Sequence, residues 1–254
     1  MKVMSYFSMK YGVYAPEILV QWALDSGYST LFLAEINNTG SALSFVRSAQ
    51  RKGLHPVLGV ELRNGMQIQA TIMARNNRGF HEMNRYITPF IHDNKPFPSV
   101  LPHFSNCWVF YPINNALTRP LLSHEFYQID LRQLANWEIR YASKFERNKV
   151  VLLSPMLFKT KRDFNKHRLL RAIHHNVLLS KLSPEWHATG QERLLSRCEL
   201  EALCGGYLDF WERTQQCMQD CLFSFAFGEE ALPQNPASYT GSKSMDEQLL
   251  RKLC

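Results

Sequence analysis

The spacing of apolar residues along the chain changes between two periods, one typical of helices and one typical of strands. Helical spacing, bounded by capping or helix-ending residues, predicts helices over residues 15–27, 39–53, 78–90, 132–145, 163–182 and 208–218. Short apolar or alternating runs predict strands over residues 29–35, 56–63, 66–74, 107–113, 126–132, 149–155 and 222–227. The two kinds of segment alternate through most of the chain, so the predicted fold class is α/β.

Two α/β architectures fit this alternation, an α/β barrel and an open doubly wound sheet. The run STLFLAE at residues 29–35 is apolar over most of its length, as in a strand buried on both faces of a parallel sheet. No glycine-rich phosphate loop follows the first strand, which argues against the nucleotide-binding version of the open sheet. Near the end of the chain, the polar stretch PQNPASYTGSKS at residues 233–244 predicts a linker.

The charge balance is basic, with a formal net charge of +7 and a sequence pI of about 9.1. This excess permits contact with nucleic acid or with an acidic partner but establishes neither. Most of the excess is spread along the chain, except for one cluster from Lys159 to Arg171.

Within that cluster, His167, Arg171 and His174 recur at i, i+4 and i+7, with Arg168 beside them, so they share one face of the predicted helix. One interpretation is a basic strip that contacts nucleic-acid phosphates or an acidic partner. The other is a solvated face opposite the apolar residues of the same helix, which are Leu169, Leu170, Ile173 and Val177.

Targeting and redox signals are few. The sequence contains no run of eighteen apolar residues and no basic segment followed by an apolar core, so we expect neither a transmembrane helix nor a signal peptide, and a cytoplasmic location. Six cysteines are present without a C-x-x-C pair. We expect reduced thiols in or near the core, with a zinc cluster or a disulfide framework as the alternatives.

Several long segments resemble one protein family. They are LFLAEINNTGSALSFVRSAQRKGLHPVLGVELRN (31–64), MARNNRGFHEMNRYI (73–87), DFNKHRLLRAIHHNVLLSKL (163–182) and YTGSKSMDEQLLRKLC (239–254). Together they resemble the PHP (polymerase and histidinol phosphatase) domain at the N-terminus of the alpha subunit of bacterial DNA polymerase III. The resemblance implies a distorted seven-stranded α/β barrel of the PHP type, similar to a TIM barrel.

The resemblance also implies a division of the chain. Residues 1–232 would form the PHP domain, and residues 233–254 would form a linker and the start of the following polymerase region. The sequence stops at Cys254, inside what resembles a continuing helix of that region. We therefore expect a fragment of a longer polypeptide, whose nucleotidyl-transfer residues lie beyond this sequence.

In metal-bearing members of the family, histidines, aspartates and a bridging glutamate hold metal ions at the carboxyl ends of the barrel strands. Where the family has two histidines in its opening motif, this chain has Lys2 and Met4. Where the family has Thr-Asp-His, this chain has Glu35 and Ile36 at the last two positions. Glu61 is retained in the Gly-x-Glu motif, whereas no Asp or His occurs between residues 148 and 161, where a later ligand motif would fall.

An ammonium group has no lone pair for a metal, and an isoleucine has no donor atom. We therefore expect a dismantled metal site of which Glu35 and Glu61 remain, with no catalytic residue and no cofactor. We also expect Lys2 to pair with Glu35, Glu61 or both, so that a tethered cation replaces the lost metal charge. The alternative is that Lys2 is a frayed terminal residue in solvent.

The function that the resemblance implies is a noncatalytic structural module in DNA replication. Its partners would be the remainder of the polymerase alpha subunit, a proofreading exonuclease that docks on it, and DNA through the parent polymerase. An alternative is a metal-dependent 3′–5′ exonuclease or phosphoesterase with zinc or manganese bound at a rebuilt site. A free-standing DNA-binding protein is a third hypothesis, supported by the positive charge alone.

Overall fold

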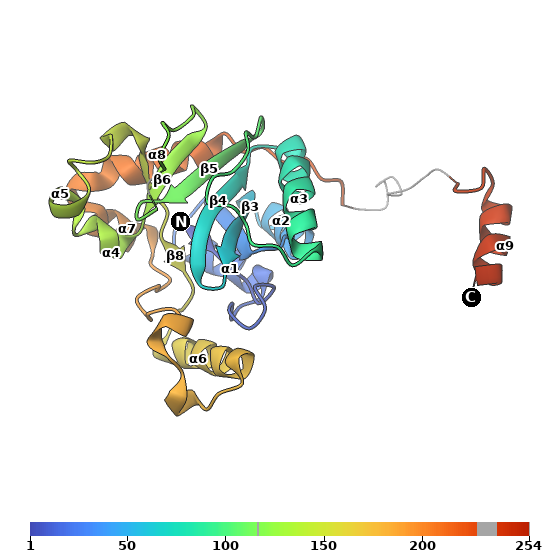
Figure 1. Ribbon diagram of the computed structural model, residues 1–254, viewed down its shortest axis with the longest axis horizontal. Coiled ribbons are helices and arrows are strands. Elements are labelled where there is room, and N and C mark those ends of the chain that lie inside the picture. Colours follow the sequence, from blue (N-terminus) through green and yellow to red (C-terminus); the bar gives the residue numbers. More distant parts are fainter. Residues whose placement is uncertain (116, 228–237, 254) are drawn as a thin grey trace. The chain divides into compact units, whose positions relative to one another are not determined.

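The computed structural model describes residues 1–115, 117–227 and 238–253 (Figure 1). The chain divides into two compact units, Met1–Phe223 and Ser224–Cys254. The domain boundary expected between residues 232 and 233 lies outside the described residues. Within the second unit, the described part contains helix α9 (Lys243–Leu253).

The first unit is built around one mixed sheet with the strand order β7-β6-β5-β4-β3-β2-β1-β8. Strands β3, β4 and β5 pair antiparallel, and all other neighbouring strands pair parallel. The strands are β1 (Lys2–Val3), β2 (Thr30–Ile36), β3 (His55–Asn64), β4 (Gln67–Ala74), β5 (Cys107–Pro112), β6 (Glu125–Ile129), β7 (Val150–Leu152) and β8 (Pro155–Met156).

The two end strands of this order, β7 and β8, belong to one bent segment. Between them, the Leu153 N–H donates to the carbonyl of Ile129 in β6 (2.9 Å), and the Ser154 carbonyl accepts from the Lys2 N–H in β1 (3.3 Å). Residues 150–156 therefore pair with β6 at one end and with β1 at the other. Counted as one bent strand, this segment completes a circuit of seven strands, which agrees with the predicted α/β barrel.

Helices connect and cover the strands of the first unit (Figure 1). They are α1 (Pro16–Asp25), α2 (Ala42–Arg51), α3 (Asn77–His92), α4 (Leu131–Leu134), α5 (Trp137–Arg140), α6 (Lys161–His175), α7 (Arg197–Cys204) and α8 (Leu208–Gln219). None of the helices in the described ranges is long and apolar enough to cross a membrane.

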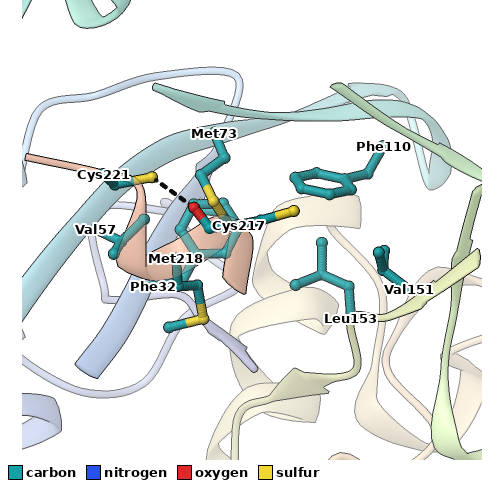
Figure 2. Close-up of a cluster of buried hydrophobic side chains, with 10 residues drawn as sticks. Phe32, Val57, Met73, Phe110, Val151, Leu153, Cys217, Met218 and Cys221 are labelled. Atoms are coloured by element: carbon teal, nitrogen blue, oxygen red, sulfur yellow. Dashed lines mark hydrogen bonds between the residues drawn. The ribbon is translucent and has the colours of Figure 1, made fainter. Parts of the chain in front are cut away.

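The core combines sheet residues with α8 and the chain just after it. Figure 2 shows sulfur atoms from Met73, Cys217, Met218 and Cys221 gathered among apolar side chains such as Phe110. Burial raises the pKa of the Cys217 thiol to about 12. Among the described residues the cysteines are free, as expected; Cys198 is exposed, and the buried ones are Cys107, Cys204, Cys217 and Cys221.

Three predicted elements differ from the structure. The helix predicted over residues 132–145 is two short helices, α4 and α5. The strand predicted over residues 222–227 is reduced to one isolated bridge between Leu222 and Asn76. The helix predicted over residues 163–182 begins and ends earlier, because a capping box on Thr160 starts it and Asn176, in a left-handed conformation, ends it.

Candidate functional site

The side chain of Lys2 extends into the interior of the barrel. Its Nζ forms an ion pair with Glu61 of β3 and donates to Thr71 Oγ1 of β4 (3.2 Å) and Gln128 Oε1 of β6 (3.4 Å). Thr71 Oγ1 also donates to Gln128 Oε1 (3.0 Å). Lys2 is 1% exposed, which excludes the alternative of a frayed terminal residue in solvent. Side chains from three strands, β3, β4 and β6, therefore converge on the ammonium group of a fourth, β1.

Glu61 lies between two cations. Its Oε2 pairs with Lys2, and its Oε1 pairs with the guanidinium of Arg63, two residues further along β3. All three side chains are buried. Burial alone would raise the pKa of the Glu61 carboxyl, but Arg63 and Lys2 outweigh it and hold this pKa below its ordinary value. Glu61 is therefore ionised at neutral pH, with both oxygens engaged.

Glu35 has a different environment, made of hydroxyl groups. Ser5, Ser8 and Ser41 each direct a hydroxyl at its carboxyl oxygens, and the backbone N–H of Ser5 lies 3.1 Å from Oε2. Burial raises the pKa of Glu35, although these hydrogen bonds oppose the shift. Among the described residues no cation pairs with Glu35, so of the partners expected for Lys2, which were Glu35, Glu61 or both, the structure has Glu61.

Met4 and Ile36, at the other two lost ligand positions, lie in an apolar cluster. Met4 is buried against Tyr11, Leu157 and other apolar residues, and Ile36 packs against the same cluster. Two positions that would carry histidine ligands in the family thus contribute to packing. The removal of both apolar side chains from water stabilises the fold at these two positions.

The donor set does not fit the metal centre that the family resemblance implies. A metal ion needs several lone pairs converging on one point, and the described ranges contain no group of three His, Cys, Asp or Glu side chains that could hold one. The lone pairs of Glu61 face Lys2 and Arg63, and those of Glu35 face three serines. The arrangement suits the ammonium group of Lys2 rather than a bound metal ion.

Part of the predicted exposed face of α6 is buried in the structure. His167 is fully buried, where its Nδ1 lies 2.7 Å from the Tyr11 carbonyl and its Nε2 accepts from the Ala188 N–H (3.0 Å). Because the carbonyl can only accept, Nδ1 carries the proton and the ring is neutral. Burial lowers the pKa of His167 to about 4, despite the bond to Tyr11.

Arg171 is also buried, whereas two of the apolar residues expected opposite it, Leu169 (52%) and Ile173 (57%), are more than half exposed. The other two, Leu170 and Val177, are half-buried, as is Arg168, and His174 is exposed. The four predicted members of a basic strip therefore do not form one surface. The reason is that loops after β1 and after α6 supply hydrogen-bond partners for His167 and Arg171, which the helix pattern alone does not contain.

The predictions missed several residues of this site, among them Arg63, Thr71 and Gln128. A signal in the sequence points to the first of them. Arg63 follows Glu61 by two positions on a strand, so both side chains take the same side of the sheet. Thr71 lies opposite Glu61 because a register shift between Leu62 and Arg63 interrupts the pairing of β3 and β4, whereas a regular hairpin would place Ala70 there. Gln128 has no such local signal, because β6 reaches the site only through closure of the barrel.

Parts of the chain are similar to known proteins. Residues 1–109 match the family model of the PHP domain. The chain is 22% identical over 158 residues to DNA polymerase III subunit alpha of Streptococcus pyogenes serotype M3, covering 61% of this chain and 15% of that protein. It is 34% identical over 86 residues to the error-prone DNA polymerase of Symbiobacterium thermophilum, covering 34% of this chain and 8% of that protein.

Among solved structures, a protein of Bifidobacterium adolescentis described as a metal-dependent phosphoesterase aligns with 99% of this chain and 82% of its own, at 12% identity and a TM-score of 0.33. By sequence, residues 1–109 are similar to a PHP domain. The whole chain spans only a small part of the polymerases it matches.

Proposed function

We propose that this chain is the N-terminal PHP domain of a polypeptide of the DNA polymerase III alpha type, and that its role is structural rather than hydrolytic. The family match over residues 1–109 and the similarity to two kinds of bacterial polymerase support the assignment to this domain. The geometry around Lys2 supports the noncatalytic role.

The observation that carries the proposal is the ion pair between Lys2 and Glu61 inside the barrel. A glutamate that bridges metal ions must present both oxygens to them, but here Lys2 and Arg63 engage one oxygen each. Binding a divalent cation at Glu61 would place it beside two fixed positive charges, which repel it. The tethered ammonium provides the charge balance that a metal would otherwise provide.

In this role the barrel would support the polymerase region of the same polypeptide and provide a surface for a proofreading exonuclease. The exposed apolar side chains of α6 and the turn after it are consistent with a contact surface, since Leu169, Ile173 and Leu178 are each more than half exposed. DNA would be reached through the parent polymerase.

Metal content tests the proposal. The chain is purified without chelator, dialysed against zinc or manganese and then against metal-free buffer, and analysed for bound elements. We expect clearly less than one ion per chain in every sample. The Glu61→Gln variant serves as the matched control, because any adventitious surface metal is unaffected by it.

Two or more retained ions per chain, lost in Glu61→Gln, would favour the alternative of a metal-dependent 3′–5′ exonuclease or phosphoesterase. An assay on single-stranded DNA with the metal-loaded protein would then show whether the domain hydrolyses phosphodiester bonds. Hydrolysis lost in Glu61→Gln would overturn the structural role.

A further inference from the structure

A cavity of about 810 Å³ lies beside the Lys2 site, between the loop after β1, the ends of β2 and β3, and α6. Its lining includes two buried arginines, Arg63 and Arg171, together with aromatic and methionine side chains. Cavities of this size accommodate small organic ligands.

Arg171 is a buried charge without a counter-ion. It is 6% exposed; its Nε donates to the Trp186 carbonyl (2.7 Å), and its Nη2 lies 2.9 Å from His175 Nε2 and 3.5 Å from Met66 Sδ. Each of these partners is neutral, because His175 must accept from a guanidinium through an unprotonated nitrogen. Among the described residues no carboxylate pairs with Arg171, and none of them accepts from Nη1.

A second arginine, Arg63, adds to the positive charge of the cavity lining. The guanidinium of Arg63 lies 4.5 Å from the centre of the Tyr11 ring, and that of Arg171 lies 5.6 Å from the same centre. Arg63 shares its carboxylate, Glu61, with Lys2. The only acid in the described lining, Glu185, is exposed at the rim. Two permanently charged guanidiniums thus line the cavity, and the carboxylate that pairs with Arg63 is shared with Lys2.

Burying a charge without a counter-ion lowers the free energy of unfolding of a protein. The cation–π interaction of Arg171 with the Tyr11 ring offsets part of this loss. The remaining N–H groups on Nη1 are suited to an oxyanion, because a guanidinium presents parallel donors that match the oxygens of a phosphate or carboxylate. A ligand with such a group would complete the arrangement.

Much of the rest of the lining is apolar or aromatic, with Ser8, Asn37 and Asn38 as polar members. The Trp186 ring stacks on His175, with ring centres 4.3 Å apart and planes 15° apart. Phe7, Met9 and Met66 complete this part of the cavity. Aromatic faces and flexible thioethers pack well against planar rings of varied shape.

We propose that this cavity binds a small molecule that joins an oxyanion to a flat aromatic ring. Arg171 holds the oxyanion with Arg63 nearby, and the ring lies against the aromatic and methionine side chains. The oxyanion is a phosphate, as in a nucleotide, or a carboxylate, as in an aromatic acid. No metal takes part in this binding.

Isothermal titration calorimetry on the full chain, in low-salt buffer with EDTA, tests the proposal. The probes are deoxyadenosine monophosphate, indole-3-acetate, inorganic phosphate and deoxyadenosine. We expect one of the first two to bind at least tenfold more tightly than either of the last two, and the tighter of them identifies the oxyanion. The presence of EDTA makes the result independent of the metal content that tests the proposed function.

Two sets of variants connect binding to the cavity. Arg171→Met is expected to weaken binding at least tenfold, whereas Arg168→Met, on the same helix but outside the lining, leaves it unchanged. Met9 is 78% exposed at the rim, so its substitution does not threaten the fold. Met9→Glu should weaken binding and Met9→Lys should strengthen it.

The proposal is overturned if neither composite probe binds more tightly than phosphate or deoxyadenosine alone. It is also overturned if Arg171→Met binds as Arg168→Met does, or if the two Met9 variants bind equally. The Met9 pair decides the matter if Arg171→Met does not fold.

Discussion

Replacing Lys2 with methionine removes the ammonium group from the barrel interior while keeping a side chain of similar length. Glu61 then retains Arg63 as its only cationic partner among the described residues, and Thr71 and Gln128 lose a shared donor. The Thr71–Gln128 hydrogen bond (3.0 Å) remains. The variant therefore isolates the contribution of the tethered cation.

The expected magnitude follows from burial. Removing one partner of a buried ion pair typically costs about 3–5 kcal/mol of unfolding free energy. Because Arg63 still engages one oxygen of Glu61, we expect Lys2→Met to lie at the lower end, about 3 kcal/mol. In a domain of this size that loss corresponds to a fall in Tm of roughly 6–12 °C. Glu61→Gln should cost more, since it leaves both Lys2 and Arg63 buried without a carboxylate.

Urea unfolding at pH 7.5, followed by circular dichroism, measures both variants and the double variant Lys2→Met/Glu61→Gln. The double variant should be more stable than the sum of the single losses predicts, by at least about 1 kcal/mol, because contacting residues are not additive. A Lys2→Met variant within about 0.5 kcal/mol of the parent would refute the tethered cation. Additive losses would refute it equally.

Three further predictions concern other parts of the first unit. Gly12→Ala places a Cβ 1.8 Å from a backbone carbonyl oxygen and should lower the free energy of unfolding, measured in urea, by more than about 2 kcal/mol. The control Gly206→Ala has no atom within 4 Å of its Cβ and should change this free energy by less than about 0.5 kcal/mol. The pKa of His167 falls from its ordinary 6.5 to about 4 in the folded protein, so the stability that the neutral ring contributes is present above pH 6.5 and lost as the pH falls towards 4. When the pH is lowered from 7.5 to 4, the free energy of unfolding measured in urea should therefore fall by about 3 kcal/mol less in His167→Gln than in the parent. In a variant with Cys198 and Cys254 replaced by serine, the four buried thiols should react with a thiol reagent only after unfolding, and fast labelling of the folded protein would contradict their burial.

Sequence reasoning predicts the α/β class well, because short apolar or alternating runs indicate most of the strands and helical spacing indicates many of the segments between them. It also anticipates that Lys2 meets a carboxylate, since Glu61 is the retained acid of a strand that lies two places from β1 in the sheet. It does not predict which carboxylate. That choice depends on the serines around Glu35, which come from the loop after β1 and from the start of α2.

The orientation of α6 could not be predicted from its own residues. Both faces of the helix contain apolar and basic side chains, so its pattern is compatible with either rotation. The Tyr11 carbonyl and the Ala188 N–H decide the outcome for His167, and both belong to segments distant from the helix in sequence. Buried polar side chains are placed by such partners rather than by periodicity.

The closure of the sheet by residues 150–156 also affects how the domain is made. Strand β1 lies between β2 and β8, with Lys2 opposite both Phe32 and Pro155. During synthesis, β1 therefore cannot pair with β8 until more than half of the chain has been made, which takes roughly 8–30 s at ordinary translation rates. Until then Lys2 lacks the strand that covers it, and Arg63 is the other cation available to Glu61, so we expect the Lys2–Glu61 ion pair to lose its water only when the barrel closes.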